Sequence, residues 1–212
     1  MSDSSWAQVM EELRQTLNLQ HQGREAALPL CRQVVQSSSR AIRSIHRKEF
    51  DAARAKLDAT RQLVREMQAA LAPYPELCYS NYRSDAEKEY VEGEAVLAMV
   101  LNQPLPNPED LEVTIPAYLN GMAEAASECR RYVLDLMRAG NLSEADRIMA
   151  TMEEIYDELI TVDFPDSLTG GLRRACDALR TVLERTRSDL ALTHIQTELL
   201  RAIGNAMDKL NK

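Results

Sequence analysis

The chain has 212 residues, an apolar fraction of 45%, few aromatic residues and a formal net charge of −8. Sparse glycine, proline and aromatic residues favour a helical protein and argue against strand-rich sandwiches and barrels. The acidic balance excludes a protein that coats nucleic acid with its whole surface, but it leaves room for a local basic face.

The cysteines and the hydropathy pattern narrow the class further. Cys31, Cys78, Cys129 and Cys176 lie about 50 residues apart and form no CxxC pair. This spacing favours buried free thiols over a disulfide framework or a zinc site. No apolar run approaches the roughly 18 residues of a membrane helix, and no signal peptide is visible. We therefore expect a cytoplasmic protein with no membrane partner.

Along the chain, apolar residues recur every three or four positions, which predicts amphipathic helices. Gly23 is expected to end an N-terminal helix within residues 1–22. The proline-rich segment 103–110 is expected to link two helices of one bundle, so that 1–212 form a single all-α domain. The expected helices cover residues 1–22, 24–46, 49–71, 75–102, 117–138, 142–160 and 167–211.

The last of these helices is longer than a single bundle needs. Its apolar period continues to Met207, either in one helix or in two that break near Thr193. We expect its tail to be a subunit interface.

Residues 87–94 place four carboxylates directly before the apolar run 95–101. On a helix, Glu89 and Glu92 share one face, while Glu87 and Glu94 lie roughly opposite. A helix that becomes apolar all round is buried, and a carboxylate beside it needs a partner, a proton or a metal. For Glu87 and Glu94 we expect ordinary solvated or ion-paired side chains.

A second acidic pair, Glu124 and Glu128, is spaced to share one face of helix 117–138. Two helices that each offer two carboxylates can converge on a divalent cation such as Mg²⁺ or Mn²⁺. A di-iron site would want Glu-x-x-His on two helices, whereas His21, His46 and His194 are scattered. On spacing alone, surface acids paired with Arg or Lys are the simpler interpretation.

A basic cluster that includes Arg40, Arg43 and Arg47 lies near the end of helix 24–46. Cations there complement the helix dipole and stay solvated, which is the simpler account. The alternative is a phosphate-facing patch. The segment by itself leaves both open.

Four segments in order resemble the translin/translin-associated factor X (TRAX) family, closer to its catalytic TRAX branch. The resemblance covers roughly residues 24–190. The Glu-Tyr-Val-Glu motif is the part that points to TRAX rather than to translin. The segments are Ser39–Arg47, Glu89–Glu92, Tyr118–Arg131 and Leu172–Asp177.

The resemblance implies a seven-helix protomer that assembles into a hollow homo-oligomer, often an octamer, with a second translin-like subunit possible but not required. TRAX-type members are Mg²⁺-dependent endoribonucleases that act on single-stranded or short duplex RNA inside the cavity. Translin-type members bind single-stranded RNA or DNA without the full acid set. The third hypothesis for the function is a helical scaffold whose acidic residues lie on the surface.

The resemblance also implies functional residues. The ligands of Mg²⁺ or Mn²⁺, which are also the catalytic carboxylates, would be Glu89, Glu92, Glu124 and Glu128. Glu128 would be a ligand or the general base, since no histidine is expected nearby. Without metal, the mean pKa of these acids should rise. Expected phosphate contacts are Arg40, Arg43, Arg47, Arg83 and Arg131.

Three positions depart from the family pattern. Glu124 stands where Asp is common, so its carboxylate reaches one methylene further, and this puts the ligand geometry in doubt. Ser127 replaces Gly, and Ala117 replaces an Asp that would cap the helix. The full acid set nevertheless favours the catalytic branch.

Overall fold

A computed structural model describes residues 5–210, which form helices and no strand. Three short elements, η1 (Pro75–Leu77), α4 (Pro108–Leu111) and α7 (Asp166–Thr169), lie in the connections. The six long helices are α1 (Trp6–His46), α2 (Phe50–Leu71), α3 (Asn81–Val100), α5 (Ile115–Arg138), α6 (Leu142–Leu159) and α8 (Leu172–Leu210).

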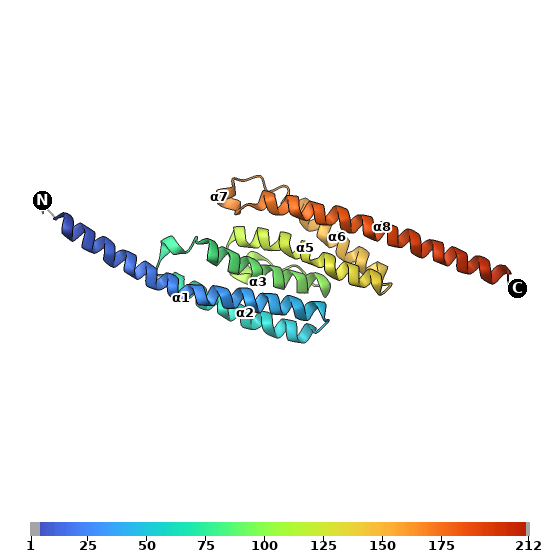
Figure 1. Cartoon of the computed structure of the whole chain (residues 1–212), viewed down its shortest axis with the longest axis horizontal. Coiled ribbons are helices and arrows are strands. Elements are labelled where there is room, and N and C mark those ends of the chain that lie inside the picture. The colour runs from blue at the N-terminus through green and yellow to red at the C-terminus, as the bar shows by residue number, and fades with distance from the viewer. Residues whose placement is uncertain (1–4, 211–212) are drawn as a thin grey trace.

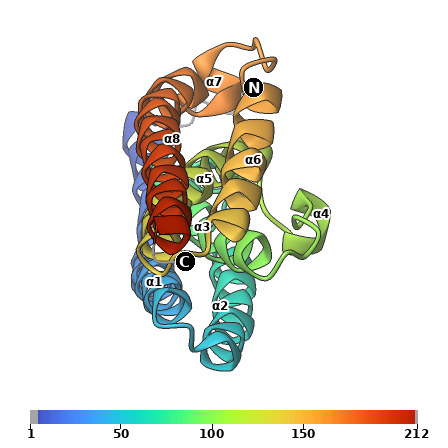
Figure 2. The same cartoon turned by 90° about the vertical axis from the view of Figure 1, so that its right-hand side faces the viewer.

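The long helices stack as three pairs: α1 with α2, α3 with α5, and α6 with α8 (Figures 1 and 2). The α3–α5 pair is the middle layer, with α3 packed on α1 and α2, and α5 packed on α6 and α8. One hydrophobic cluster runs through all three layers, from Ala27 in α1 to Leu190 in α8. The all-α fold is therefore confirmed, and the core continues across the proline-rich linker.

The expected helix end at Gly23 is wrong, because α1 continues unbroken through this residue. Gly23 is buried, and a Cβ atom there would lie only 2.3 Å from the ring of Tyr74. The glycine admits the tyrosine ring, and the packing around it holds the helix together despite the weak helix propensity of glycine. The two expected N-terminal helices are thus one.

The central helix α3 is buried on nearly all sides in its second half, as its apolar run predicts. Every residue from Gly93 to Val100 is buried. Gly93 lies against α2, since a Cβ atom there would meet Leu57 at 2.8 Å. Its lack of a side chain makes room for a neighbouring helix.

Both ends of the bundle extend into arms (Figure 1). The α1 arm exposes Trp6, Leu13 and Leu17, and α8 runs past position 193 as one helix. The exposed apolar side chains of the α8 arm are Leu192, Ile195, Leu199, Leu200, Ile203 and Met207.

The four cysteines are free, and three of them are buried, as expected. Among residues 5–210, no helix combines the length and the hydropathy that crossing a membrane requires.

Candidate metal and RNA site

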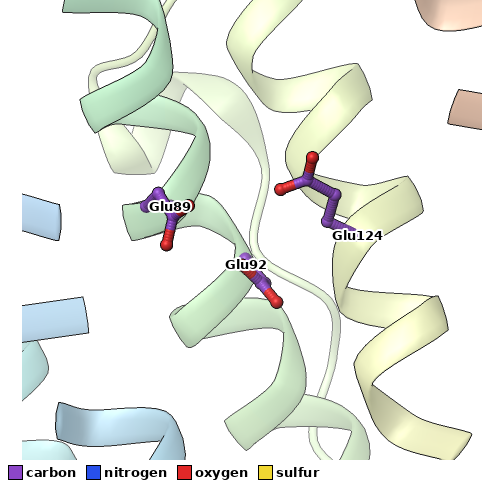
Figure 3. A group of neighbouring side chains, drawn as sticks. All are labelled: Glu89, Glu92 and Glu124. Atoms are coloured by element: carbon purple, nitrogen blue, oxygen red, sulfur yellow. The ribbon is translucent and has the colours of Figure 1, made fainter. Parts of the chain in front are cut away.

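Three of the four expected ligands converge between the two helices of the middle layer. Glu89 and Glu92 project from α3 and Glu124 projects from α5, with one carboxylate oxygen of each within 4.8 Å of the others (Figure 3). All three side chains are half-buried. The extra methylene of Glu124 therefore still allows its carboxylate to reach the pair on α3.

Gly121 allows this convergence, because it lies at a close approach of α3 and α5. A Cβ atom at Gly121 would lie 2.6 Å from the Cβ of Val91 and 2.8 Å from the carbonyl oxygen of Lys88. Both distances are too short for a real contact, so a larger residue would push the helices apart. Glu124 is one turn further along α5, and this close approach brings its carboxylate to the cluster.

Without a bound cation, mutual repulsion and burial disfavour the ionised forms of the three carboxylates. Burial, and then the charges of Glu89, Glu124 and Glu128, raise the pKa of Glu92 to about 8. Burial raises the pKa of Glu89 above its usual range, and the charge of Glu124 adds to this effect. Two of the acids thus show the rise expected for a metal-free cluster.

A lysine that sequence reasoning did not single out also belongs to the cluster. The Nζ of Lys88 donates a hydrogen bond to Oε1 of Glu124 at 2.8 Å. Burial disfavours the ammonium, but the contact with Glu124 and the nearby charges of Asp85 and Glu89 outweigh it, so the pKa of Lys88 is raised. Lys88 precedes Glu89 in the sequence, and this adjacency was the only available signal.

Glu128, the fourth expected ligand, lies outside the three-acid cluster and has a different partner. Its Oε1 is 2.6 Å from Nε2 of His46, whose side chain is only 3% exposed. The expectation that no histidine lies near these acids is therefore wrong. His46 ends α1 next to the buried Ile45, which placed it on the edge of the apolar face. Spacing along the chain gave no sign that α5 would pass it.

The remaining two acids of the 87–94 segment are buried and paired. Glu87 is fully buried and accepts hydrogen bonds from Arg83, Gln68 and both N and Oγ1 of Thr114. Glu94 pairs with Arg54 at 2.7 Å. Of the two environments expected for Glu87 and Glu94, solvated or ion-paired, the structure shows the ion-paired one.

The five expected phosphate-binding arginines divide into two groups. Arg40, Arg43, Arg47 and Arg131 are exposed. Arg83 instead holds Glu87 at 2.8 Å and the carbonyl oxygen of Cys78 at 3.1 Å. A phosphate contact by Arg83 would break this network, so we leave it out of the proposed RNA face.

A surface cleft of about 420 Å³ lies along α5 from Ser127 to Arg138, beginning one turn beyond Glu124. Glu128 and Arg131 lie in its wall, together with Arg138 from the end of the helix. Along this wall Glu128 is followed by Arg131 and then by Asp135, which pairs with Arg138 at 3.3 Å. Arg131 therefore offers an exposed cation one turn from Glu128, as a contact with a phosphate requires.

Comparison with known proteins shows which of them this chain resembles in sequence and in structure. No family model matches the chain. The uncharacterized protein MJ0175 of Methanocaldococcus jannaschii is 30% identical over 198 residues, which cover 91% of this chain and 87% of that protein. The structure of an AfC3PO–duplex RNA complex matches with a TM-score of 0.82 and 34% identity over 88% of this chain and 97% of that chain. A further structure of AfC3PO matches with a TM-score of 0.81 at the same identity.

Apo-NeC3PO matches with a TM-score of 0.76 at 19% identity, and this supports the fold alone. The fold and the site therefore define an all-helical protein of the C3PO type with an acidic cluster between its two central helices. The chain belongs to the translin/TRAX family.

Proposed function

We propose that the protein is a metal-dependent endoribonuclease that hydrolyses phosphodiester bonds of single-stranded or short duplex RNA. One observation carries the proposal: Glu89, Glu92 and Glu124 converge from two helices on a point that one cation can reach. A related structure, that of AfC3PO, is a complex with duplex RNA, and this supports RNA as the substrate class.

The residues fit a hard divalent cation. Carboxylate oxygens are the donors that Mg²⁺ and Mn²⁺ prefer, and the set contains no soft sulfur or imidazole ligand. The raised pKa values of Glu89 and Glu92 fit as well, because both acids would gain from a positive charge between them. Glu89, Glu92 and Glu124 would hold the ion. When bound, it supplies Lewis-acid chemistry, neutralising charge on the phosphate and lowering the pKa of water.

The chain's own residues supply the proton acceptor and the phosphate contacts. Glu128 is held through one oxygen by His46 and has no hydrogen bond to Oε2 among residues 5–210. That oxygen can take the proton of an attacking water, which makes Glu128 the general base. Arg131 lies one turn further along α5, where it would hold a neighbouring phosphate.

We further propose that the active form is a hollow homo-oligomer, an octamer, that encloses the RNA. The apolar side chains exposed on both arms support subunit contacts, because a monomer gains nothing from exposing so large an apolar surface. Arg40, Arg43, Arg47 and Arg131 would line the inner wall. Enclosure of a basic wall reconciles RNA binding with the net charge of −8.

A cleavage assay tests the proposal. Labelled single-stranded and short duplex RNA are incubated with Mg²⁺, Mn²⁺ or EDTA, using the wild type and the Glu89→Gln/Glu92→Gln double variant. A matched control, Glu154→Gln/Asp157→Asn, removes an exposed acidic pair of the same spacing from α6. We expect metal-dependent cleavage by the wild type and the control only.

Other outcomes separate the alternatives. Cleavage that survives in the Glu89→Gln/Glu92→Gln variant would exclude the proposed site. Binding of RNA or single-stranded DNA without any cleavage would indicate a translin-type binding protein. Neither binding nor cleavage would leave a helical scaffold.

A further inference from the structure

The ammonium of Lys88 contacts the carboxylate of Glu124, which the proposed metal ion also needs as a ligand. Its Nζ lies 2.8 Å from Oε1 of Glu124, and its side chain is 23% exposed. No other lysine or arginine among residues 5–210 pairs with Glu89, Glu92 or Glu124 at this distance range. The metal-free cluster thus carries its own cation.

The charges of the cluster match this role. With all three acids ionised, the cluster carries a formal charge of −2 with Lys88 in place and −3 without it, so a divalent ion is attracted more strongly once Lys88 has left. The ammonium of Lys88 donates its hydrogen bond to Glu124, and Glu89 is its neighbour in the sequence. An ammonium that donates to Glu124 leaves one oxygen fewer for a metal, and its positive charge repels one.

The backbone of Lys88 is held in place, whereas its side chain can move. The carbonyl oxygen of Lys88 packs against Gly121 of α5, and this packing holds the backbone in place. The side chain is a flexible four-carbon stem with a rotatable charge. It can therefore leave Glu124 without any movement of the two helices.

We propose that Lys88 is a built-in competitor of the divalent ion: it serves as the counter-ion of Glu124 in the metal-free protein and is displaced when metal binds. Lys88 would thereby set the metal concentration at which the site fills. It is a positioning residue rather than a catalytic one. The inference rests on the proposed metal site.

Metal affinity without RNA tests the competition. Mn²⁺ binding to the full-length protein is measured by electron paramagnetic resonance for the wild type, Lys88→Met and Lys88→Arg. Lys88→Met removes the competing charge at nearly constant volume, and we expect about three- to tenfold tighter Mn²⁺ binding, the scale of a partly buried ion pair. Lys88→Arg keeps the charge and should bind Mn²⁺ no more tightly than the wild type.

A charge-matched control separates the effect of the direct contact between Lys88 and Glu124 from that of the overall electrostatic field of the protein. Lys209→Gln removes one positive charge from the exposed end of the α8 arm. It should leave Mn²⁺ affinity unchanged. An equal gain in this control and in Lys88→Met would overturn the inference, because long-range electrostatics would then explain both.

A second readout reports the ammonium itself. An amine-reactive acetylating reagent, with mass spectrometry of the modified sites, should label Lys88 several-fold faster after Mg²⁺ is added, since displacement frees its Nζ. Unchanged or slower labelling would contradict displacement. Lys209 provides the internal reference for the rate.

The outcomes distinguish the inference from the proposed function. If the wild type binds Mn²⁺ and Lys88→Met binds it equally or more weakly, Lys88 is not a competitor, although the metal site stands. If neither protein binds Mn²⁺, both the inference and the proposed metal site fail.

Discussion

The imidazole Nε2 of His46, at the last residue of α1, lies 2.6 Å from the Oε1 of Glu128 in the middle of α5. Nδ1 of the same ring is buried and has no hydrogen-bond partner among residues 5–210. Within that range, the hydrogen bond to Glu128 is therefore the one polar contact of the ring. This contact fixes the carboxylate in the wall of the cleft along α5, one turn from Glu124.

His46→Ala should lower the cleavage rate by roughly 10- to 100-fold, the usual cost of losing an outer partner of a functional group. RNA affinity should stay nearly constant, because His46 is too buried to contact RNA. His46→Gln, which can still donate to Glu128, should recover part of the rate. Single-turnover kinetics at saturating RNA measure this effect, and an unchanged rate in His46→Ala would remove Glu128 as the positioned base.

Gly121→Ala should destabilise the fold and weaken metal binding together. The new Cβ atom would meet Val91 and the carbonyl oxygen of Lys88, at 2.6 and 2.8 Å, and would force α5 away from α3. Overpacking of this kind costs about 1 to 3 kcal/mol. Urea denaturation and Mn²⁺ titration check the two effects.

Gly204→Ala is the matched control for this substitution. Among residues 5–210, nothing beyond the neighbouring residues and backbone of its own helix lies within 4 Å of a Cβ atom built at Gly204, which is also helical. The change should therefore stabilise the protein by about 0.5 to 1 kcal/mol through helix propensity. A loss of stability in both variants would point to a general effect of removing glycine.

The stability of the metal-free protein should fall as the pH rises from about 5 to 9. Burial and neighbouring charges raise the pKa of Glu92 from 4.5 to about 8, so the folded state binds this proton more tightly than the unfolded state. The stabilisation is complete below pH 4.5 and is lost as the pH rises through 8. With allowance for solvent screening, Glu92 contributes roughly 2 to 4 kcal/mol to this change.

Glu92→Gln isolates this contribution. The variant should match the wild type near pH 5 and exceed its stability near pH 9 in EDTA, as measured by chemical denaturation. Mg²⁺ at alkaline pH should stabilise the wild type but not the variant, because a ligand that binds only the folded state stabilises it. Parallel pH curves for the two proteins would show that Glu92 titrates normally.

Glu87→Ala should be strongly destabilising, although Glu87 lies only two residues from Glu89. The carboxylate is fully buried and receives hydrogen bonds from Arg83, Gln68 and Thr114. Its removal leaves Arg83 without its partner, which costs about 3 to 5 kcal/mol. Thermal denaturation checks this, with Glu11→Ala as the control, because Glu11 forms an exposed pair with Arg14 worth about 0 to 1 kcal/mol.

The Leu199→Glu/Ile203→Glu double variant tests the proposed oligomer. Both side chains lie on the exposed apolar face of the α8 arm, and two charges there should dissociate any assembly that buries it. Native mass spectrometry should show a smaller species, and RNA cleavage should fall with it. Asn205→Glu, on the opposite side of the same helix, should leave the mass unchanged.

Much of the fold follows from local patterning. The apolar period predicted the bounds of α2, α5 and α6 within about two residues, because each of these helices buries one stripe against the bundle. The run 95–101 predicted a helix buried all round. Gly23 misled the prediction, since a glycine that admits the ring of Tyr74 is indistinguishable in sequence from one that ends a helix.

The acidic pairs show which contacts the spacing along a single helix does not predict. Spacing along a helix correctly grouped Glu89 with Glu92, and it separated them from Glu87 and Glu94. Along α5, however, the same rule grouped Glu124 with Glu128, whereas the structure gives Glu124 to the cluster and Glu128 to His46. A residue's neighbours on its own helix are fixed by the helical repeat, but its partners on another helix depend on how the two pack.

By itself, the sequence determined an all-α chain, most of its helical segments, and the faces on which four candidate carboxylates lie, because these follow from propensity and from the 3.6-residue repeat. Only the tertiary structure decided which carboxylates meet, through the close approach of α3 and α5 at Gly121. It also supplied the two partners that spacing did not reveal, Lys88 for Glu124 and His46 for Glu128. Contacts between residues 36 or 82 positions apart arise from packing, and packing has no signature within a single helix.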